Sequence, residues 1–570
     1  MREQIIKALR KATGIKEAHL EFPENEVHGD YSTNIALVSA RSEKKRPREL
    51  AEGIVKKLQK DKDLAKIVSK IEIAGPGFIN FFLSQEVLFK QLRQVVAAGE
   101  KYGSSMVGQG KTVLVEYSSP NIAKYFGIGH LRSTVIGQAL YNLYQFLGYK
   151  VIGENHLGDW GTQFGMIIAQ IKRKNLDVNN LTVVDFEKLY VEFNKEAQDR
   201  PQLREEAKHW FKKLEKGDQE ARQIWQKARE ISLAEFERIY QLLGVSIENV
   251  HGESFYAGGA GTVEDKKSAV IQEAREKGLV KKSEGAEIIE LKGMPPGMLL
   301  KSDGATTYLT RDLAAIKYRI ETWNPVLLIY EVGADQKLHF RQLFEAARLL
   351  SWAKNRELVH VAHGLIRGKW GKLSTRRGET VRLEEVLEEA INRARKIIDG
   401  SETGRGLSEK EKKEIAKAVG VGAIKYFDLS HHPTSDIVFD WERLFLLEGN
   451  SAPYLQYTFA RTQSVLLKSK KQKVKNRITN QGREINREEM SLLRSFSRFS
   501  EIIIDAAKNY SPNLLAAYLF DLAQKYNHFY NRHRIIGSDN EEFRLALNAA
   551  TGQILKNGLR LLGIETPEKM

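Results

Sequence analysis

The fold is decided by residues 112–165, whose sequence reads TVLVEYSSPNIAKYFGIGHLRSTVIGQALYNLYQFLGYKVIGENHLGDWGTQFG. They open with a β-rich run at residues 112–117, which predicts a buried strand. From His130 the apolar residues recur with the period of a helix, which we expect to end near Gly148. A second strand-like run follows at residues 151–155. The pattern therefore predicts a right-handed βαβ unit with two parallel strands.

The loop between this strand and helix contains Gly127 and Gly129 and ends at His130. In a βαβ unit it faces a crevice, where backbone N–H groups and the helix dipole suit a phosphate. One interpretation is a tight turn that needs glycine only for its backbone shape. A second is a dinucleotide site, but Arg132 stands where the third glycine of G-x-G-x-x-G is required for close packing. The third, an ATP site in which His130 contacts phosphate oxygens, is favoured by the neighbouring motifs.

Three short motifs surround this loop. They are SPNIAK at residues 119–124, GHLRST at residues 129–134 and NHLGDWGTQFG at residues 155–165. Together they resemble the arginyl-tRNA synthetases, a family of class I aminoacyl-tRNA synthetases. The chain departs from that family at Gly127, where the first histidine of the His-x-Gly-His signature would stand, and at Tyr125, where proline is usual. Because His130 and the helix after it are intact, we interpret the loop as a variant of the signature.

A second glycine-bounded stretch, GKWGKLSTRRG at residues 368–378, is strongly basic. Taken alone, it predicts a solvated turn. Beside an ATP site, a flexible basic loop can close on the triphosphate and stabilise charge as pyrophosphate leaves. It resembles the Lys-Met-Ser-Lys-Ser loop of class I synthetases. Lys372 stands at the first lysine of that loop and Thr375 at the second. The resemblance implies that Lys124 compensates for the missing second lysine. The resemblance implies catalytic roles for Lys124, Gly129, His130 and Lys372, and ATP binding by Gly127, Gly129, His130, Lys372 and Ser374.

A third region, residues 299–340, places polar residues beside a predicted strand at residues 326–330, where α/β enzymes hold their substrates. Arginine requires carboxylates that match its planar guanidinium group. Tyr308 and Asp312 are one helical turn apart and can face one ligand if the helix begins by Leu309. Without the resemblance, Asp312 is interpreted as an ordinary acidic residue of a first helical turn. The resemblance implies that Glu116, Tyr308 and Asp312 bind the side chain of arginine, that Asn121 and Gln336 bind its backbone end, and that Ser118 belongs to the same site.

Composition sets limits on the class of protein. The 570 residues suffice for several domains, and contents of 42% hydrophobic and 28% charged residues are typical of a globular chain. A net charge of +16 favours a polyanionic partner such as nucleic acid. The chain has no cysteine, which excludes disulfides, thiolate zinc sites and a cysteine nucleophile. No apolar run is long enough to span a bilayer, so we expect no membrane partner and a cytoplasmic location.

The resemblance extends over almost the whole chain and implies its organisation. We expect an α/β protein with a Rossmann-like parallel-sheet catalytic core, an α+β N-terminal domain and an all-α C-terminal anticodon-binding bundle. The expected boundaries are 1–108 for the N-terminal domain, 109–170 and 300–385 for the core, 171–299 for a helical insertion, 386–450 for junction helices and 451–570 for the bundle. In the family the N-terminal domain touches the tRNA elbow, and Phe78 and Asn80 are the candidate contacts. A core phenylalanine beside a turn-capping asparagine is the alternative interpretation.

The implied function is that of an arginine–tRNA ligase. It would use L-arginine, arginine tRNA and ATP with Mg²⁺ as a substrate complex, need no tightly bound metal or organic cofactor, and act as a monomer. Two alternatives stay open: a paralogue that adenylylates another acceptor or has lost activation, and a non-catalytic tRNA-binding protein. The anticodon bundle disfavours another acceptor. The acids Glu116 and Asp312 disfavour the binding protein, because RNA binding alone needs no carboxylate pair.

Overall fold

The computed structural model describes residues 1–257, 266–368, 381–469 and 484–570. Its N-terminal part is an α+β unit in which helices cover a small antiparallel sheet of order β1-β3-β2. The elements are α1 (Arg2–Thr13), β1 (Tyr31–Thr33), α2 (Ile35–Glu43), α3 (Pro47–Leu58), β2 (Val68–Ala74), β3 (Phe78–Leu83) and α4 (Gln85–Ala98). Ile79 and Phe81 of β3 and Leu9 and Ala51 of the helices are buried between sheet and helices, which gives this unit a hydrophobic core of its own.

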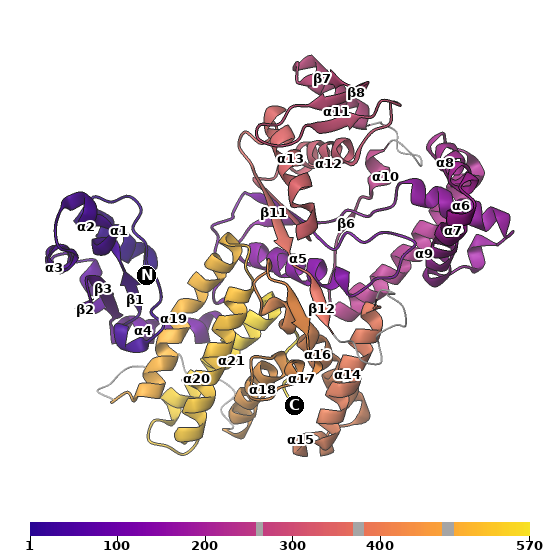
Figure 1. Ribbon diagram of the computed structural model, residues 1–570. Coiled ribbons are helices and arrows are strands. Elements are labelled where there is room, and N and C mark those ends of the chain that lie inside the picture. The colour runs from indigo at the N-terminus through magenta and orange to yellow at the C-terminus, as the bar shows by residue number, and fades with distance from the viewer. Residues whose placement is uncertain (258–265, 369–380, 470–483) are drawn as a thin grey trace.

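A parallel five-stranded sheet forms the centre of the molecule (Figure 1). Its order is β11 (Glu357–His363), β10 (Leu327–Gly333), β4 (Thr112–Glu116), β5 (Lys150–Asn155) and β6 (Asn249–Val250). Helix α5 (Gly129–Phe146) connects β4 to β5, so the predicted βαβ unit is confirmed. Residues 113–115 of β4 are fully buried, as expected for a strand with both faces covered.

The strand order creates a crevice at one place in this sheet. From β4 the chain continues to β5 and β6 on one side, whereas β10 and β11 are added on the other side. The connection after β4 therefore runs towards β5, whereas the connection after β10 runs towards β11 on the opposite side. In open parallel sheets, ligands bind at such a switch point. The sheet topology thus places the candidate site beside Glu116 and Gly333, at the ends of these two strands.

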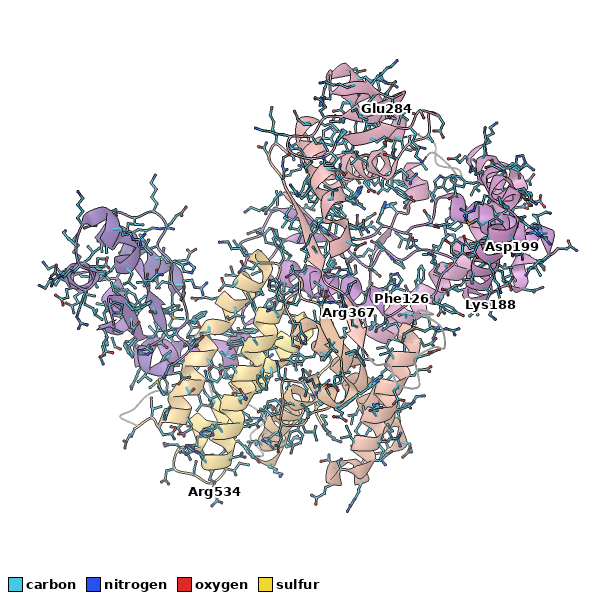
Figure 2. The ribbon with its side chains drawn as sticks, viewed as in Figure 1. Phe126, Lys188, Asp199, Glu284, Arg367 and Arg534 are labelled. Atoms are coloured by element: carbon cyan, nitrogen blue, oxygen red, sulfur yellow. The ribbon has the colours of Figure 1, made fainter. Side chains whose placement is uncertain are left out.

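The region expected as a helical insertion is more varied than predicted. It does contain α6 (Thr162–Arg173), α7 (Val183–Asp199), α8 (Gln202–Glu215), α9 (Gln219–Leu243), α10 (Glu253–Tyr256) and α11 (Lys266–Glu276). However, β6 belongs to the central sheet, and β7 (Val280–Ser283), β8 (Ala286–Ile289) and β9 (Gly297–Leu300) form a separate antiparallel sheet. Glu284 and Gly285 join β7 to β8 with positive φ at both positions, as a two-residue hairpin turn requires. Glu284 lies at the periphery of the molecule (Figure 2).

The remaining part of the chain is mainly helical. Helices α12 (Tyr308–Trp323) and α13 (Lys337–Leu349) flank β10 in the chain. The junction comprises α14 (Leu383–Gly400), α15 (Glu402–Arg405), α16 (Glu409–Leu429) and α17 (Trp441–Leu444), together with a parallel strand pair, β12 (Ile366–Gly368) and β13 (Ile437–Phe439). The C-terminal bundle comprises α18 (Ala452–Lys468), α19 (Arg487–Lys508), α20 (Asn513–Arg532) and α21 (Glu541–Leu561). The predicted all-α character of this bundle is confirmed.

The N-terminal unit docks on the C-terminal bundle, beside α19 in Figure 1. The guanidinium group of Arg2 pairs with Asp505 at 2.7 Å, and the hydroxyl of Tyr102 donates to the Phe496 carbonyl at 2.8 Å. Polar contacts therefore join the N-terminal unit to the C-terminal bundle. Among the helices of the four described segments, none combines the length and the apolar composition needed to cross a bilayer.

Candidate active site

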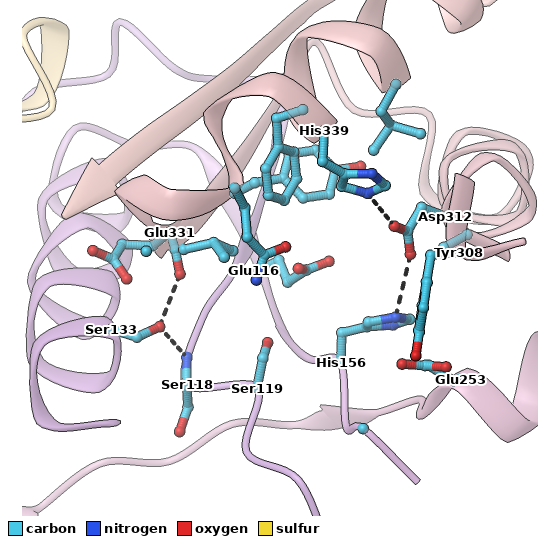
Figure 3. Close-up of a pocket in the computed structure, with 18 of the residues that line it drawn as sticks. Glu116, Ser118, Ser119, Ser133, His156, Glu253, Tyr308, Asp312, Glu331 and His339 are labelled. Atoms are coloured by element: carbon cyan, nitrogen blue, oxygen red, sulfur yellow. Dashed lines mark hydrogen bonds and ion pairs between the residues drawn. The ribbon is translucent and has the colours of Figure 1, made fainter. Parts of the chain in front are cut away.

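A cavity of about 550 Å³ opens at the carboxyl ends of β4 and β10 (Figure 3). Its wall includes the turn after β4, the start of α5, the first part of α12 and the loop after β10. The loop after β5, α10, α13 and the end of β11 complete it. Most residues expected to bind substrate converge here from positions up to 220 residues apart in the chain. These lining residues are Glu116, Ser118, Asn121, Gly129, His130, Tyr308, Asp312 and Gln336.

The turn after β4 has an unusual backbone. Ser118, Ser119 and Ala123 all have positive φ, a region that costs free energy for residues other than glycine. Ser133 of α5 holds this turn in place, because its Oγ accepts a hydrogen bond from the Ser118 N–H at 2.9 Å and donates one to the Glu331 carbonyl at 2.8 Å. Figure 3 shows both bonds. Ser133 thus joins the ends of β4 and β10 beneath the cavity.

His130 lies in the first turn of α5, where backbone N–H groups and the helix dipole favour a negatively charged ligand. Burial lowers the pKa of its imidazole to about 4, so the ring is neutral near pH 7. The Gly127 N–H donates to Nδ1 at 3.2 Å, which leaves the ring proton on Nε2. A neutral imidazole with a free Nε2–H can donate to a phosphate oxygen without adding a positive charge.

Asp312 lies on the other side of the cavity between two histidines (Figure 3). His339 Nε2 lies 2.6 Å from one carboxylate oxygen, and His156 Nε2 lies 3.7 Å from the other. Burial would raise the pKa of Asp312, but the hydrogen bond and the charge of His339 outweigh it, so this pKa is lowered. The same bond outweighs burial at His339, whose pKa is raised. Asp312 is therefore an ionised carboxylate aimed into the cavity.

Tyr308 stands at the start of α12, one turn before Asp312, and is largely exposed. The guanidinium group of Arg311 covers its ring at 4.5 Å and pairs with Glu253 at 3.1 Å. Burial raises the pKa of Glu253 to about 7. The helix begins early enough for Tyr308 and Asp312 to line one cavity, as the sequence predicted.

Glu116 has a partner that sequence reasoning missed. The buried guanidinium group of Arg319 pairs with its carboxylate at 2.5 Å, and Glu154 lies 3.7 Å from the same guanidinium. Arg319 follows Asp312 by seven residues on α12, a spacing that returns to the same helix face. That spacing indicates a shared helix face with Asp312, but it does not identify Glu116 as the partner of Arg319. Both expected acids therefore line the cavity, but they differ in their surroundings. Glu116 is paired with a buried arginine of its own chain, whereas Asp312 contacts histidines.

Three models of known protein families match most of the chain. Residues 91–441 match the model of the class I (R) tRNA synthetase catalytic domain, residues 455–570 the DALR anticodon-binding domain, and residues 1–83 the arginyl-tRNA synthetase N-terminal domain. The chain belongs to the arginyl-tRNA synthetase family. The resemblance inferred from the motifs is thereby confirmed.

Individual relatives agree over the full length. The chain is 40% identical to an arginine–tRNA ligase of Halothermothrix orenii, with 97% of this chain and 95% of the relative covered. It is also 40% identical to one of Clostridium kluyveri, with 100% and 99% covered. The crystal structure of arginyl-tRNA synthetase from Plasmodium falciparum superposes with a TM-score of 0.84 at 27% identity, covering 100% of this chain and 98% of that one.

Lys124, which was expected to be catalytic, and Gly127, which was expected to bind ATP, do not line the cavity. The ammonium group of Lys124 lies 5.3 Å from the ring centre of Tyr190. Gly127 forms an antiparallel bridge with Arg382, whose guanidinium group covers the Tyr125 ring at 3.8 Å. Both positions where the chain departs from the family signature thus contact the segment at Arg382. The expected residues Lys372 and Ser374 lie outside the described residues.

The two candidate tRNA contacts of the N-terminal unit differ in exposure. Phe78 begins β3 and is 39% exposed, so it is available to a partner. Asn80 is only 3% exposed, and its side-chain oxygen accepts a hydrogen bond from Ser32 at 2.7 Å. The structure opposes the prediction for Asn80, because its side chain is used inside the small sheet.

Proposed function

We propose that this chain is an arginine–tRNA ligase that activates L-arginine with ATP and transfers the arginyl group to the 3′ end of arginine tRNA. The observation that carries the proposal is the convergence of an ionised carboxylate, Asp312, and a helix N-terminus with a neutral histidine, His130, on one cavity. The carboxylate suits a cationic side chain, and the helix N-terminus suits a phosphate. An amino acid that bridges these two ends presents its own carboxylate to ATP.

In the proposed complex, the guanidinium group of arginine pairs with Asp312 and packs beside Tyr308. A carboxylate has about four acceptor sites, so Asp312 can keep its bond to His339 while it accepts two N–H groups. Glu116 retains its bond to Arg319 and offers its second oxygen. Ser118, Asn121 and Gln336 are proposed to hold the ammonium and carboxylate end. Lysine is rejected because it leaves some of these acceptors unpaired in a partly buried site.

ATP is proposed to bind with its phosphates at Gly129 and His130, accompanied by Mg²⁺ as part of the substrate complex. The carboxylate of arginine attacks the α-phosphorus, and pyrophosphate leaves, giving arginyl-adenylate. Lys372, Ser374 and Lys124 are proposed to neutralise charge on the departing phosphates. The terminal ribose hydroxyl of the tRNA then attacks the arginyl carbonyl, and AMP leaves. Orientation and electrostatic stabilisation suffice for both steps, so no side-chain nucleophile is required.

The tRNA is proposed to contact the bundle at a groove of about 590 Å³ between α18 and the end of α20. Its tyrosines Tyr457 and Tyr530 are 40% and 38% exposed, and the guanidinium group of Arg461 lies 4.8 Å and 4.9 Å from their ring centres. Arg534, which also lines the groove, lies at the outer end of the bundle (Figure 2). Exposed aromatic rings beside cations suit unpaired nucleotides, which stack on such surfaces. Phe78 is the proposed contact of the N-terminal unit.

A monomeric state and a cytoplasmic location stay predictions. The first is tested by light scattering of the purified chain, alone and with tRNA.

ATP–pyrophosphate exchange tests the proposed function. It is measured with each of the twenty amino acids, in the presence and in the absence of total tRNA. We expect exchange with arginine alone, and only when tRNA is present, as the family resemblance implies. Exchange with another amino acid would contradict the pocket assignment. Tight tRNA binding without exchange under any condition would favour a non-catalytic tRNA-binding protein.

A further inference from the structure

A buried lysine joins the catalytic half of the molecule to the bundle. Lys425 of α16 is 1% exposed, and its ammonium group donates to the Leu243 carbonyl at 2.5 Å and to the Gly563 carbonyl. Leu243 is the last residue of α9, and Gly563 stands two residues after Leu561, the last residue of α21. Carbonyls at helix ends lack partners within their own helix, and the helix dipole attracts a cation there. Two helix ends therefore stabilise one ammonium group.

Burial lowers the pKa of Lys425 to about 8. The charge of Glu565 attracts the Lys425 ammonium group, but burial has the larger effect on the pKa of this group. An apolar residue of similar length would fill the same space without a desolvation cost, but it would leave both carbonyls unpaired. Lys425 thus satisfies both carbonyls and links the ends of the two helices.

From α9 the contacts continue into the active site. Tyr240 precedes Leu243 by about one helical turn on α9. Its hydroxyl lies 2.7 Å from Ser118 Oγ and accepts a hydrogen bond from the Asn155 side chain at 2.9 Å. Ser118 is part of the positive-φ turn that lines the cavity. The end of α9 therefore contacts this turn directly, in addition to the bonds that Ser133 and Thr134 of α5 make with Ser118.

In the other direction the contacts reach the proposed RNA groove. Gln456, fully buried on α18, donates to the Ala418 carbonyl of α16 at 3.0 Å and to the Glu565 carbonyl at 2.8 Å. Its neighbour Tyr457 lines the groove. Glu565 stands two residues after Gly563, the bundle partner of Lys425. A displacement of α18 by a bound nucleotide therefore acts on α16, which carries Lys425, and on the segment that contains Gly563.

A second polar link runs parallel to the first. Asn142 donates to the Leu561 carbonyl at 3.1 Å, Gln138 donates to Asn142 at 3.0 Å, and the Tyr117 hydroxyl lies 3.2 Å from the Gln138 oxygen and donates to it. The end of α21 is thus connected through the half-buried Asn142 and the buried Gln138 to Tyr117, which precedes Ser118 directly after β4. Packed, hydrogen-bonded elements of this kind transmit small displacements, because a close-packed interior does not absorb them.

We propose that Lys425 is a positioning residue that couples occupancy of the α18–α20 groove to the geometry of Ser118 in the active site. The proposal rests on the proposed function, since it concerns how bound tRNA affects that reaction. Lys425 touches no substrate and acts through α9 and Tyr240.

The test compares three variants in aminoacylation of arginine tRNA. Lys425→Met removes the donor at similar volume. Lys425→Arg keeps a donor, and the adjoining cavity of about 730 Å³ has room for the larger group. Lys417→Met is the matched control, an exposed lysine of the same helix. We expect Lys425→Met to lower kcat by about 5- to 100-fold while KM for arginine and for tRNA changes little. We expect Lys425→Arg to restore most of kcat and Lys417→Met to match the wild type.

A double-mutant cycle with Tyr240→Phe distinguishes coupling from general destabilisation. If Lys425 acts through Tyr240, the second substitution costs little once the first is made, so the two losses do not multiply. If Lys425→Met does not fold, Gln456→Met takes its place in the cycle with the same expectation. Losses that multiply, or a Lys425→Met kcat equal to that of Lys417→Met, would overturn the proposal. A wild-type chain that fails to charge tRNA would instead contradict the proposed function.

Discussion

His339 Nε2 lies 2.6 Å from Asp312 Oδ2, so a single hydrogen bond joins α13 to α12 at the wall of the candidate active site. This bond fixes the carboxylate that the account assigns to the guanidinium group of arginine. Its geometry, its charge and its dependence on pH can each be tested.

Asp312→Asn removes the charge while it keeps the size of the side chain. We expect arginine affinity to fall by about 2–3 kcal/mol, because a charge-assisted pair in a partly buried site is lost. ATP affinity should stay nearly constant. Calorimetry on both ligands measures the two effects, with Glu321→Gln, an exposed acid of the same helix, as the control. Unchanged arginine affinity in Asp312→Asn would remove the pocket assignment.

The Asp312–His339 pair predicts a pH-dependent stability. The pKa of Asp312 is lowered from 3.8, so its contribution is present above that value and is lost as pH falls through the folded pKa. The pKa of His339 is raised from 6.5, so its contribution is present below that value and is lost as pH rises through the folded pKa. The pair therefore stabilises most between roughly pH 4 and pH 6.5.

Thermal unfolding of wild type and His339→Gln measures this effect. The difference in melting temperature should be largest near pH 5–6, about the midpoint of that window, and should shrink towards pH 9. His209→Gln, an exposed histidine of α8, serves as the control. A His339→Gln difference that does not vary with pH would show that the charged pair is not formed.

His130→Ala tests the neutral histidine at the start of α5. Because the pKa of His130 is about 4, the ring stays neutral throughout the working range and should add no pH dependence between about pH 6 and pH 9. Loss of its N–H donor should lower kcat of pyrophosphate exchange by about 100-fold and leave arginine affinity unchanged. His130→Asn retains a side-chain N–H and should lose less. Equal losses in the two variants would argue against a hydrogen-bond role.

Arg132 and Asp428 form an ion pair of 3.0 Å in which neither side chain is exposed, and they join α5 to α16. Burial raises the pKa of Asp428 despite the neighbouring guanidinium group. Arg132→Met should destabilise the chain by about 3–5 kcal/mol, because it leaves an uncompensated buried charge. The double variant Arg132→Met with Asp428→Leu should recover most of that loss, as measured by thermal inactivation. A double variant less stable than Arg132→Met alone would contradict this explanation.

The central βαβ unit and the facing pair Tyr308 and Asp312 could be predicted from the sequence. Both depend on side-chain periods of two or 3.6 residues, which are local properties of the chain. Arg132 was also informative in the sequence, because a long side chain at that position disfavours the dinucleotide-binding motif. The structure adds that this side chain is buried against Asp428. The local sequence pattern was therefore sufficient for features that lie within one helix or one βαβ unit.

The partner of Glu116 could not be predicted in the same way. Its ion pair with Arg319 joins residues about 200 positions apart, and only the docking of α12 on β4 brings them together. The burial of Asn80 could not be predicted for a related reason, since strand pairing decides which side chains of β3 are covered. The β7–β8 hairpin was missed because its turn, Glu284-Gly285, is not one of the Asn-Gly or Asp-Gly pairs that indicate a hairpin. The charged residues around it suggested a helix instead.

Charging of purified arginine tRNA tests the central claim most directly. The wild-type chain is given ATP, the tRNA and one of three labelled amino acids: arginine, lysine or citrulline, whose neutral urea group has the shape of guanidinium without its charge. We expect charging with arginine, and rates lower by about 10³-fold or more with lysine and citrulline. Neither of these two side chains offers the Asp312 carboxylate a charged, two-pronged donor. Comparable charging with citrulline would contradict recognition through Asp312. Absence of charging with arginine would contradict the function itself.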